Sequence, residues 1–83
     1  MNIGVYVLFS IKDKKTYVGS TNDLERRLLE HQFGKVQSTK NRLPLKLVYF
    51  EECDSLLASR IKEKYFKSCS GRKKLRKILG NLV

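Results

Sequence analysis

The spacing of apolar residues changes several times along this chain, which indicates several secondary-structure elements. The stretch 3–9 is apolar almost throughout, and 16–19 is a shorter β-branched and aromatic run, so the pattern predicts two strands. The lysine-rich segment 12–15 separates them, which favours a turn and an antiparallel hairpin. Further on, Pro44 leads into another apolar run, 45–50, which predicts a third strand.

A capped amphipathic helix is predicted directly after the second strand. Asn22 is a suitable N-cap, and Glu25 three residues later completes a capping-box pattern. Leu24 and Leu28 then recur at helical spacing, and Gly34 gives a C-terminal stop.

Two more helices are predicted after the third strand. The earlier one starts at Asp54 or Ser55, and a break at Ser70-Gly71 separates it from a last helix at 72–82. The apolar positions of the earlier helix are Leu57, Ile61 and Tyr65 or Phe66. The order β-β-α-β-α-α predicts an α+β fold, a small three-stranded antiparallel sheet flanked by helices. Because the chain has only 83 residues, we expect a single domain, 1–83.

The charge balance narrows the choice of partner. A formal net charge of +10 on 83 residues favours an anionic partner, nucleic acid first and a membrane surface second. No apolar run approaches the ~18–20 residues of a membrane span, and no signal-peptide pattern precedes 3–9, so we expect no membrane association. Cys53 and Cys69 are too few and too far apart for a zinc or redox site, which predicts reduced thiols in a cytoplasmic protein.

Two short strings carry a tyrosine near a glycine, Gly4-Val5-Tyr6 and Tyr17-Val18-Gly19. Side chains alternate across a strand, so an even-numbered hairpin loop would place Tyr6 and Tyr17 on one face of the sheet. The sequence leaves the register open between direct opposition of the two tyrosines and an offset of several residues. A shared face would bring two phenols together beside a basic turn.

Three other residues are candidates for chemistry. Arg27 and His31 are four residues apart, so they project from one face of the first predicted helix, close to Tyr17. Glu63 is surrounded in sequence by cations. Either it forms an ordinary helical ion pair, or it is an ionised carboxylate that holds a hard divalent cation.

Basic residues gather in the C-terminal third and in the loop before the third strand. Such a surface suits contact with the phosphate backbone, which gives affinity without sequence readout. The residues we expect to bind nucleic acid are Lys40, Arg42, Lys62, Lys64, Lys67, Arg72, Lys73 and Lys74.

Taken together, these motifs resemble the GIY-YIG nuclease family. The two tyrosine strings correspond to the name-giving motifs, with valine in place of isoleucine in both, and Arg27 and His31 match the helix motif. The segments 42–49 and 63–68 are also similar to the family. The resemblance covers nearly the whole chain and is closest to the small stand-alone bacterial members.

This resemblance implies a metal-dependent endonuclease acting on DNA, with RNA as a second candidate substrate. It implies that Glu63 is the one protein ligand of Mg²⁺ or Mn²⁺ and that Arg27 stabilises charge on the scissile phosphate. Tyr6 or Tyr17 would be the general base, and His31 would assist. Because a phenol has an ordinary pKa of about 10, we expect the nearby cations to lower it.

Two other functions stay open at this point. One is a binding module that holds nucleic acid without cutting it, and the other is a basic adaptor in a complex such as a DNA repair assembly. In many members of the family, attached domains determine which nucleic acid is cleaved, and we expect no such domain in these 83 residues. We therefore expect this chain to recognise nucleic-acid structure, to act with low specificity or to use a protein partner.

Overall fold

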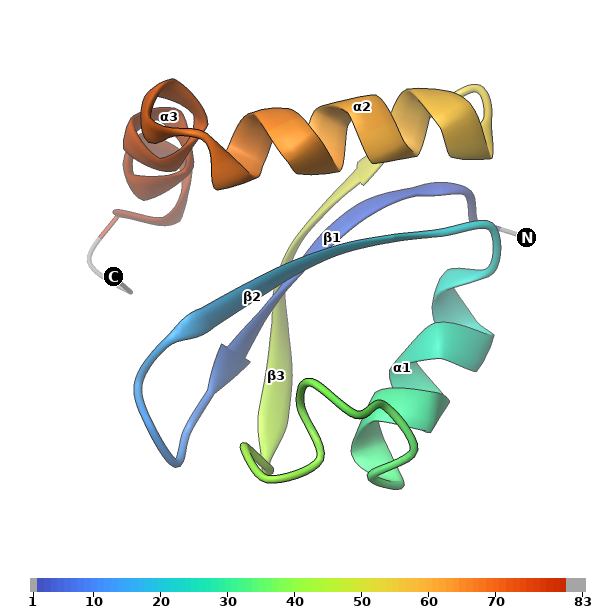
Figure 1. Ribbon diagram of the computed structural model, residues 1–83, viewed down its shortest axis with the longest axis vertical. Helices are drawn as coiled ribbons and strands as arrows, with labels where there is room; N and C mark the ends of the chain where they lie inside the picture. Colours follow the sequence, from blue (N-terminus) through green and yellow to red (C-terminus); the bar gives the residue numbers. More distant parts are fainter. Residues whose placement is uncertain (1, 81–83) are drawn as a thin grey trace.

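The computed structural model describes residues 2–80, which form a three-stranded antiparallel sheet with helices on both faces (Figure 1). The strands are β1 (Gly4–Ser10), β2 (Thr16–Thr21) and β3 (Leu45–Glu52). The helices are α1 (Leu24–Gln32), α2 (Leu56–Lys67) and α3 (Cys69–Leu79). The predicted α+β class and the order β-β-α-β-α-α are confirmed. None of the helices within residues 2–80 is long and apolar enough to cross a membrane.

Strand β1 lies in the middle of the sheet, in the order β2-β1-β3, and both of its faces are covered. Tyr6 pairs with Gly19, and Leu8 pairs with Tyr17. The two tyrosines therefore share a face of the sheet, and Tyr17 lies across from the next residue of β1 on that face, Leu8. The shared face is confirmed, and the register lies between the two that the sequence left open.

Each face of the sheet has its own small core. On one face, β1 and β2 pack against α2 and α3 through Val5, Val7, Val18, Phe66 and Leu75. On the other face, toward α1, the buried residues are Tyr6, Leu8 and Leu24. Figure 1 shows the two helical layers, with α2 and α3 on one side of the sheet and α1 on the other. Tyr6 is therefore a core residue of the smaller layer as well as a candidate for chemistry.

The N-cap of α1 differs from the predicted one. Asp23 has extended backbone angles and its carboxylate accepts from the backbone N–H of Arg26, so Asp23 and not Asn22 caps the helix. The Thr21 hydroxyl accepts from the Asp23 N–H, which holds the cap in place. The Asn22 side chain accepts from the Arg26 guanidinium instead. The end of the helix near Gly34 is as predicted, since Gly34 has a φ of 72°.

The break between the last two helices also differs from its prediction. It lies at Ser68, whose side chain accepts from the Gly71 N–H and caps α3, so Ser70-Gly71 is inside the helix. A Cβ atom on Gly71 would lie 1.8 Å from the Tyr65 carbonyl oxygen. This glycine therefore permits a close approach of two helices and does not end one. Of the predicted span 72–82, residues 81–82 lie outside the described residues.

The face that α2 turns to the sheet matches the predicted apolar positions only at Phe66, which is buried. Leu57 and Ile61 are 69% and 64% exposed. The inward positions are instead the buried Ser59, the partly buried Glu63 and Phe66, at helical spacing. Hydropathy did not indicate Ser59 and Glu63 because their side chains are a hydroxyl and a carboxylate.

Candidate active site

The Tyr6 hydroxyl is the centre of a contact cluster between β1 and α1. Its oxygen lies 2.8 Å from His31 Nε2 and accepts from Arg27 Nε at 3.4 Å. Tyr6 and His31 are each 1% exposed. Arg27 and His31 share a face of α1 because they are one helical turn apart, as the sequence predicts.

Burial sets the charge states in this cluster. It raises the pKa of Tyr6 to about 12, although the hydrogen bond and the charge of Arg27 act in the opposite direction. Burial, with the nearby Arg27 charge, also lowers the pKa of His31 to about 4. At neutral pH the phenol is therefore protonated and the imidazole is neutral. The expectation that neighbouring cations lower the tyrosine pKa is wrong for Tyr6, because desolvation outweighs them.

The proton positions follow from these charge states. His31 Nδ1 lies 2.7 Å from Thr39 Oγ1, so both ring nitrogens have hydroxyl partners. The buried Tyr6 hydroxyl already accepts from Arg27 and needs an acceptor for its own proton. His31 Nε2 is that acceptor, which assigns the ring proton to Nδ1 and makes Thr39 its acceptor.

Thr39 is a site residue that the sequence did not reveal. It is 0% exposed and lies in the loop between α1 and β3. That loop is basic and polar, with neither a periodic pattern nor a recognised motif around Thr39. Its eight-residue separation from His31 carries no helical or strand signal, so only the folded structure shows the contact.

Tyr17 completes the aromatic part of the cluster. Its ring centroid lies 6.4 Å from that of Tyr6 and 5.3 Å from that of His31. Unlike Tyr6 it is only partly buried. The Lys67 ammonium, which belongs to α2, lies 5.9 Å from the centre of the Tyr17 ring. Tyr17 therefore joins the α1 side of the site to the α2 side.

Glu63 lies on α2, where two donors hold its carboxylate. Ser20 Oγ donates to Oε1 at 2.6 Å and Lys67 Nζ donates to Oε2 at 2.7 Å. Partial burial would raise the pKa of Glu63, but these hydrogen bonds, with the charges of Lys67 and Arg60, bring it below its ordinary value. The carboxylate is thus ionised. Of the two alternatives from the sequence, the ion pair with Lys67 is present, and cation binding by the ionised Glu63 carboxylate stays a prediction.

The two halves of the site meet at the open edge of the sheet. Strand β2 is an edge strand. Tyr17 and Ser20 are three residues apart on it, so their side chains point to opposite faces, toward α1 and toward α2. A cavity of about 300 Å³ lies beside this edge. Its walls come from β2, α1 and α2, through Ser20, Thr21, Asn22, Arg26, Arg27, Leu56 and Arg60. Arg27 thus reaches a hollow that α2 also lines.

The donor set suits a hard divalent cation. The Glu63 side chain is 23% exposed and presents carboxylate oxygens, the donor type that Mg²⁺ and Mn²⁺ prefer. Within residues 2–80 there is no cluster of three or more His, Cys, Asp or Glu side chains. One carboxylate is nonetheless a common protein contribution to Mg²⁺ sites, in which water and phosphate oxygens complete the shell.

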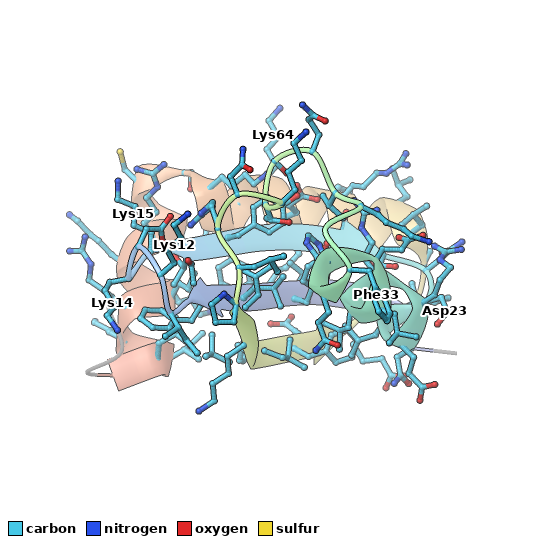
Figure 2. The ribbon with its side chains drawn as sticks, turned by 90° about the horizontal axis from the view of Figure 1, so that it is seen from below. Lys12, Lys14, Lys15, Asp23, Phe33 and Lys64 are labelled. Atoms are coloured by element: carbon cyan, nitrogen blue, oxygen red, sulfur yellow. The ribbon has the colours of Figure 1, made fainter. Side chains whose placement is uncertain are left out.

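Some of the basic residues predicted to bind nucleic acid form ion pairs and others are exposed, and Lys67 is in both groups because it pairs with Glu63. Arg42 pairs with Asp13 at 2.8 Å, and Lys62 pairs with Glu51 at 3.4 Å. The exposed members of the set are Lys40, Lys64, Lys67, Arg72, Lys73 and Lys74. Figure 2 shows Lys64 on the β2 side of the molecule, the edge at which the two halves of the site meet.

The chain is similar in sequence to one protein family and to several small proteins. The family described as GIY-YIG catalytic domain matches residues 2–76. A UPF0213 protein of Syntrophus aciditrophicus is 42% identical over 79 residues, which cover 93% of this chain and 90% of that protein. A UPF0213 protein of Clostridium perfringens is 39% identical, with 89% and 80% covered, and one of Natronomonas pharaonis is 42% identical, with 87% and 85% covered. No solved structure matches the chain significantly.

Proposed function

The chain belongs to the GIY-YIG family, whose catalytic domain is a nuclease domain, and from this premise we propose a divalent-metal-dependent endonuclease that hydrolyses phosphodiester bonds in DNA. One observation carries the proposal. The Tyr6–Arg27–His31 cluster and the ionised carboxylate of Glu63 flank the same edge strand, β2. A proton acceptor, a fixed cation and a hard-metal ligand are the groups that this hydrolysis requires.

Arg27 supplies fixed positive charge for the scissile phosphate. Its guanidinium is held by two partners, Tyr6 through Nε and Glu30 through Nη1 at 3.0 Å, so its orientation is set before substrate binds. Phosphodiester hydrolysis builds negative charge on phosphate oxygens, and preorganised cations stabilise that charge without reorganising. The guanidinium also stays charged, because arginine is not deprotonated in proteins.

Tyr6 and His31 act as a proton relay. A phenol with a pKa of about 12 is protonated at neutral pH, so it can take a proton from water only as it gives up its own. His31 Nε2 is neutral and 2.8 Å away, in position to accept that proton. As the water oxygen bonds to phosphorus, the water proton moves to Tyr6 and the phenol proton moves to His31. The bond from phosphorus to the 3′ or 5′ oxygen breaks, and that oxygen keeps the electron pair and takes a proton from solvent. This assignment makes Tyr6, rather than Tyr17, the general base.

Glu63 is the residue that would hold Mg²⁺ or Mn²⁺. When bound, the metal would act as a Lewis acid on phosphate oxygens. Ser20 keeps one carboxylate oxygen of Glu63 in place. Lys67 balances the charge of the carboxylate in the absence of a metal ion. Lys67 is exposed, so its ammonium would be available to a phosphate of the substrate if Glu63 held a metal.

A nuclease assay tests the proposal against a binding-only protein. The protein is incubated with duplex, single-stranded and branched DNA, and with RNA, in Mg²⁺, in Mn²⁺ and in EDTA. We expect metal-dependent products from at least one DNA and none in EDTA. Salt-sensitive binding without products from any substrate would overturn the nuclease and leave a binding module or adaptor.

A further inference from the structure

A second, larger cavity opens on the other side of Tyr17 and Lys67. It has a volume of about 690 Å³ and lies between the β1–β2 hairpin and the two C-terminal helices. Figure 1 shows α3 and the hairpin turn at the same end of the molecule, and Figure 2 shows Lys14 and Lys15 at that end. The volume is within the range of roughly 300–1,000 Å³ that small-molecule sites occupy.

The cavity combines a cationic rim with an apolar floor. The cations that line it are Lys14, Lys15, Lys67, Arg72 and Arg76, and no acidic side chain lines it in the part of the chain described. Its accessible apolar lining comes from the partly buried Tyr17 and Leu79. Beneath them lie the core residues Val18, Phe66 and Leu75, which are 8%, 1% and 5% exposed. A site for a bare phosphate would not need such a floor, whereas a base needs one.

We propose that this cavity holds one unpaired nucleotide of the DNA substrate, with its base on the apolar floor and its phosphates on the cationic rim. The inference rests on the proposed function and adds a substrate class, DNA with a single-stranded segment next to the cleaved bond. A base within a duplex is stacked and paired and cannot enter. An unstacked base presents a face that packs on apolar and aromatic side chains.

Contact with the candidate active site fixes where the nucleotide lies. Tyr17 and Lys67 line this cavity and also belong to the cluster around Tyr6 and Glu63. A nucleotide in the cavity is therefore adjacent in space to the phosphate at Glu63. The strand would run along the edge of β2, from one site to the other.

The backbone at Lys14 allows a separate test of the rim. Its φ is 61°, in the left-handed region where glycine or asparagine is the favoured residue. Glycine would adopt this backbone conformation more easily than lysine does, but it would remove the positive charge from the rim of the cavity. Lys14→Gly should thus weaken binding of single-stranded DNA and leave the thermal midpoint unchanged or higher.

Matched charge variants test the site by binding, without catalysis. Fluorescence anisotropy in EDTA measures the affinity for labelled oligothymidylate of about eight nucleotides and for an abasic oligomer of equal length. Lys15→Ser with Arg76→Ser removes two rim charges, and Lys12→Ser with Lys77→Ser removes two charges from residues that do not line the cavity. We expect about a tenfold loss of oligothymidylate affinity for the first pair and less than about twofold for the second.

Several outcomes would overturn the inference. Equal losses for the two pairs would show general electrostatic attraction, and equal affinity for the abasic oligomer would show that no base is bound. Failure of the nuclease proposal is separate, because it appears as absent cleavage while binding still depends on the rim. If cleavage occurs and the rim pair cuts branched DNA as the wild type does, the inference fails and the nuclease stands.

Discussion

Gly19 lies directly across from Tyr6 in the β1–β2 pair, and a Cβ atom at Gly19 would lie 2.5 Å from the Tyr6 hydroxyl oxygen. The glycine of the second tyrosine motif therefore makes room for the phenol of the first. The two motifs form one structural unit, because the missing side chain on β2 allows Tyr6 to reach His31 and Arg27.

The substitution Gly19→Ala should displace the Tyr6 ring. A contact of 2.5 Å cannot be kept, so we expect a loss of stability of about 1–3 kcal/mol, the usual cost of overpacking, together with a large loss of nuclease activity. A double-mutant cycle with Tyr6→Leu, followed by chemical denaturation, checks the cause. If the two changes add without coupling, the displaced ring is not the reason.

The substitutions Tyr6→Phe and Tyr17→Phe should differ in their effects. Tyr6→Phe removes the group between water and His31, so we expect single-turnover cleavage to fall about 10²–10⁴-fold. It also leaves His31 Nε2 without its donor, at a cost of about 1–3 kcal/mol of stability. Tyr17→Phe keeps the ring packing and should lose less than Tyr6→Phe in both measurements. The opposite order would make Tyr17 the general base.

His31 makes stability depend on pH in a defined window. Its pKa is about 4 in the folded protein and 6.5 as an ordinary value, so the unfolded chain binds the extra proton first as the pH falls. The contribution of the neutral imidazole to the free energy of unfolding is fully present above pH 6.5 and is lost between pH 6.5 and about 4. The loss is about 3 kcal/mol. Urea denaturation of wild type and His31→Gln should show the difference between them shrinking across this window, and a constant difference would refute the assignment.

Thr39 is expected to position His31 rather than to contact substrate. Thr39→Val keeps the shape and removes the acceptor of the Nδ1 proton, so we expect a lower kcat, a nearly unchanged KM and a changed pH–rate profile. Thr39→Ser restores the hydroxyl and should restore the profile. A serine variant that behaves as the valine variant does would leave Thr39 with a packing role alone.

Hydrophobic periodicity was sufficient to predict the order of elements. Strand β1 is buried on both faces and is therefore apolar in a continuous run, and Gly34 ends α1 as expected. The face of α2 was not predictable in this way, because Ser59 and Glu63 occupy inward positions. Gly71 was predicted to be a helix break, and this was wrong for a different reason. Its small size allows α2 and α3 to approach each other closely, which the spacing of residues in the sequence does not show.

The parts of the candidate site that could be predicted are those set by the regular geometry of one helix or of neighbouring strands. Arg27 and His31 lie one turn apart on a helix, and the two tyrosines follow strand alternation. The contact of Thr39 with His31 depends on the path of an irregular loop. The raised pKa of Tyr6 depends on burial within a layered fold, which composition could not indicate and which reversed the expected direction.

The most direct test of the account is cleavage by Glu63→Gln beside the matched control Glu52→Gln, an exposed carboxylate at the end of β3. Both variants lose one negative charge, so any general gain in DNA affinity is shared. With Mg²⁺ or Mn²⁺ present, we predict that Glu63→Gln loses about a thousandfold or more of the cleavage rate while DNA binding and folding persist. Glu52→Gln should cleave as the wild type does. Equal cleavage by wild type and Glu63→Gln on every DNA substrate would contradict the central claim.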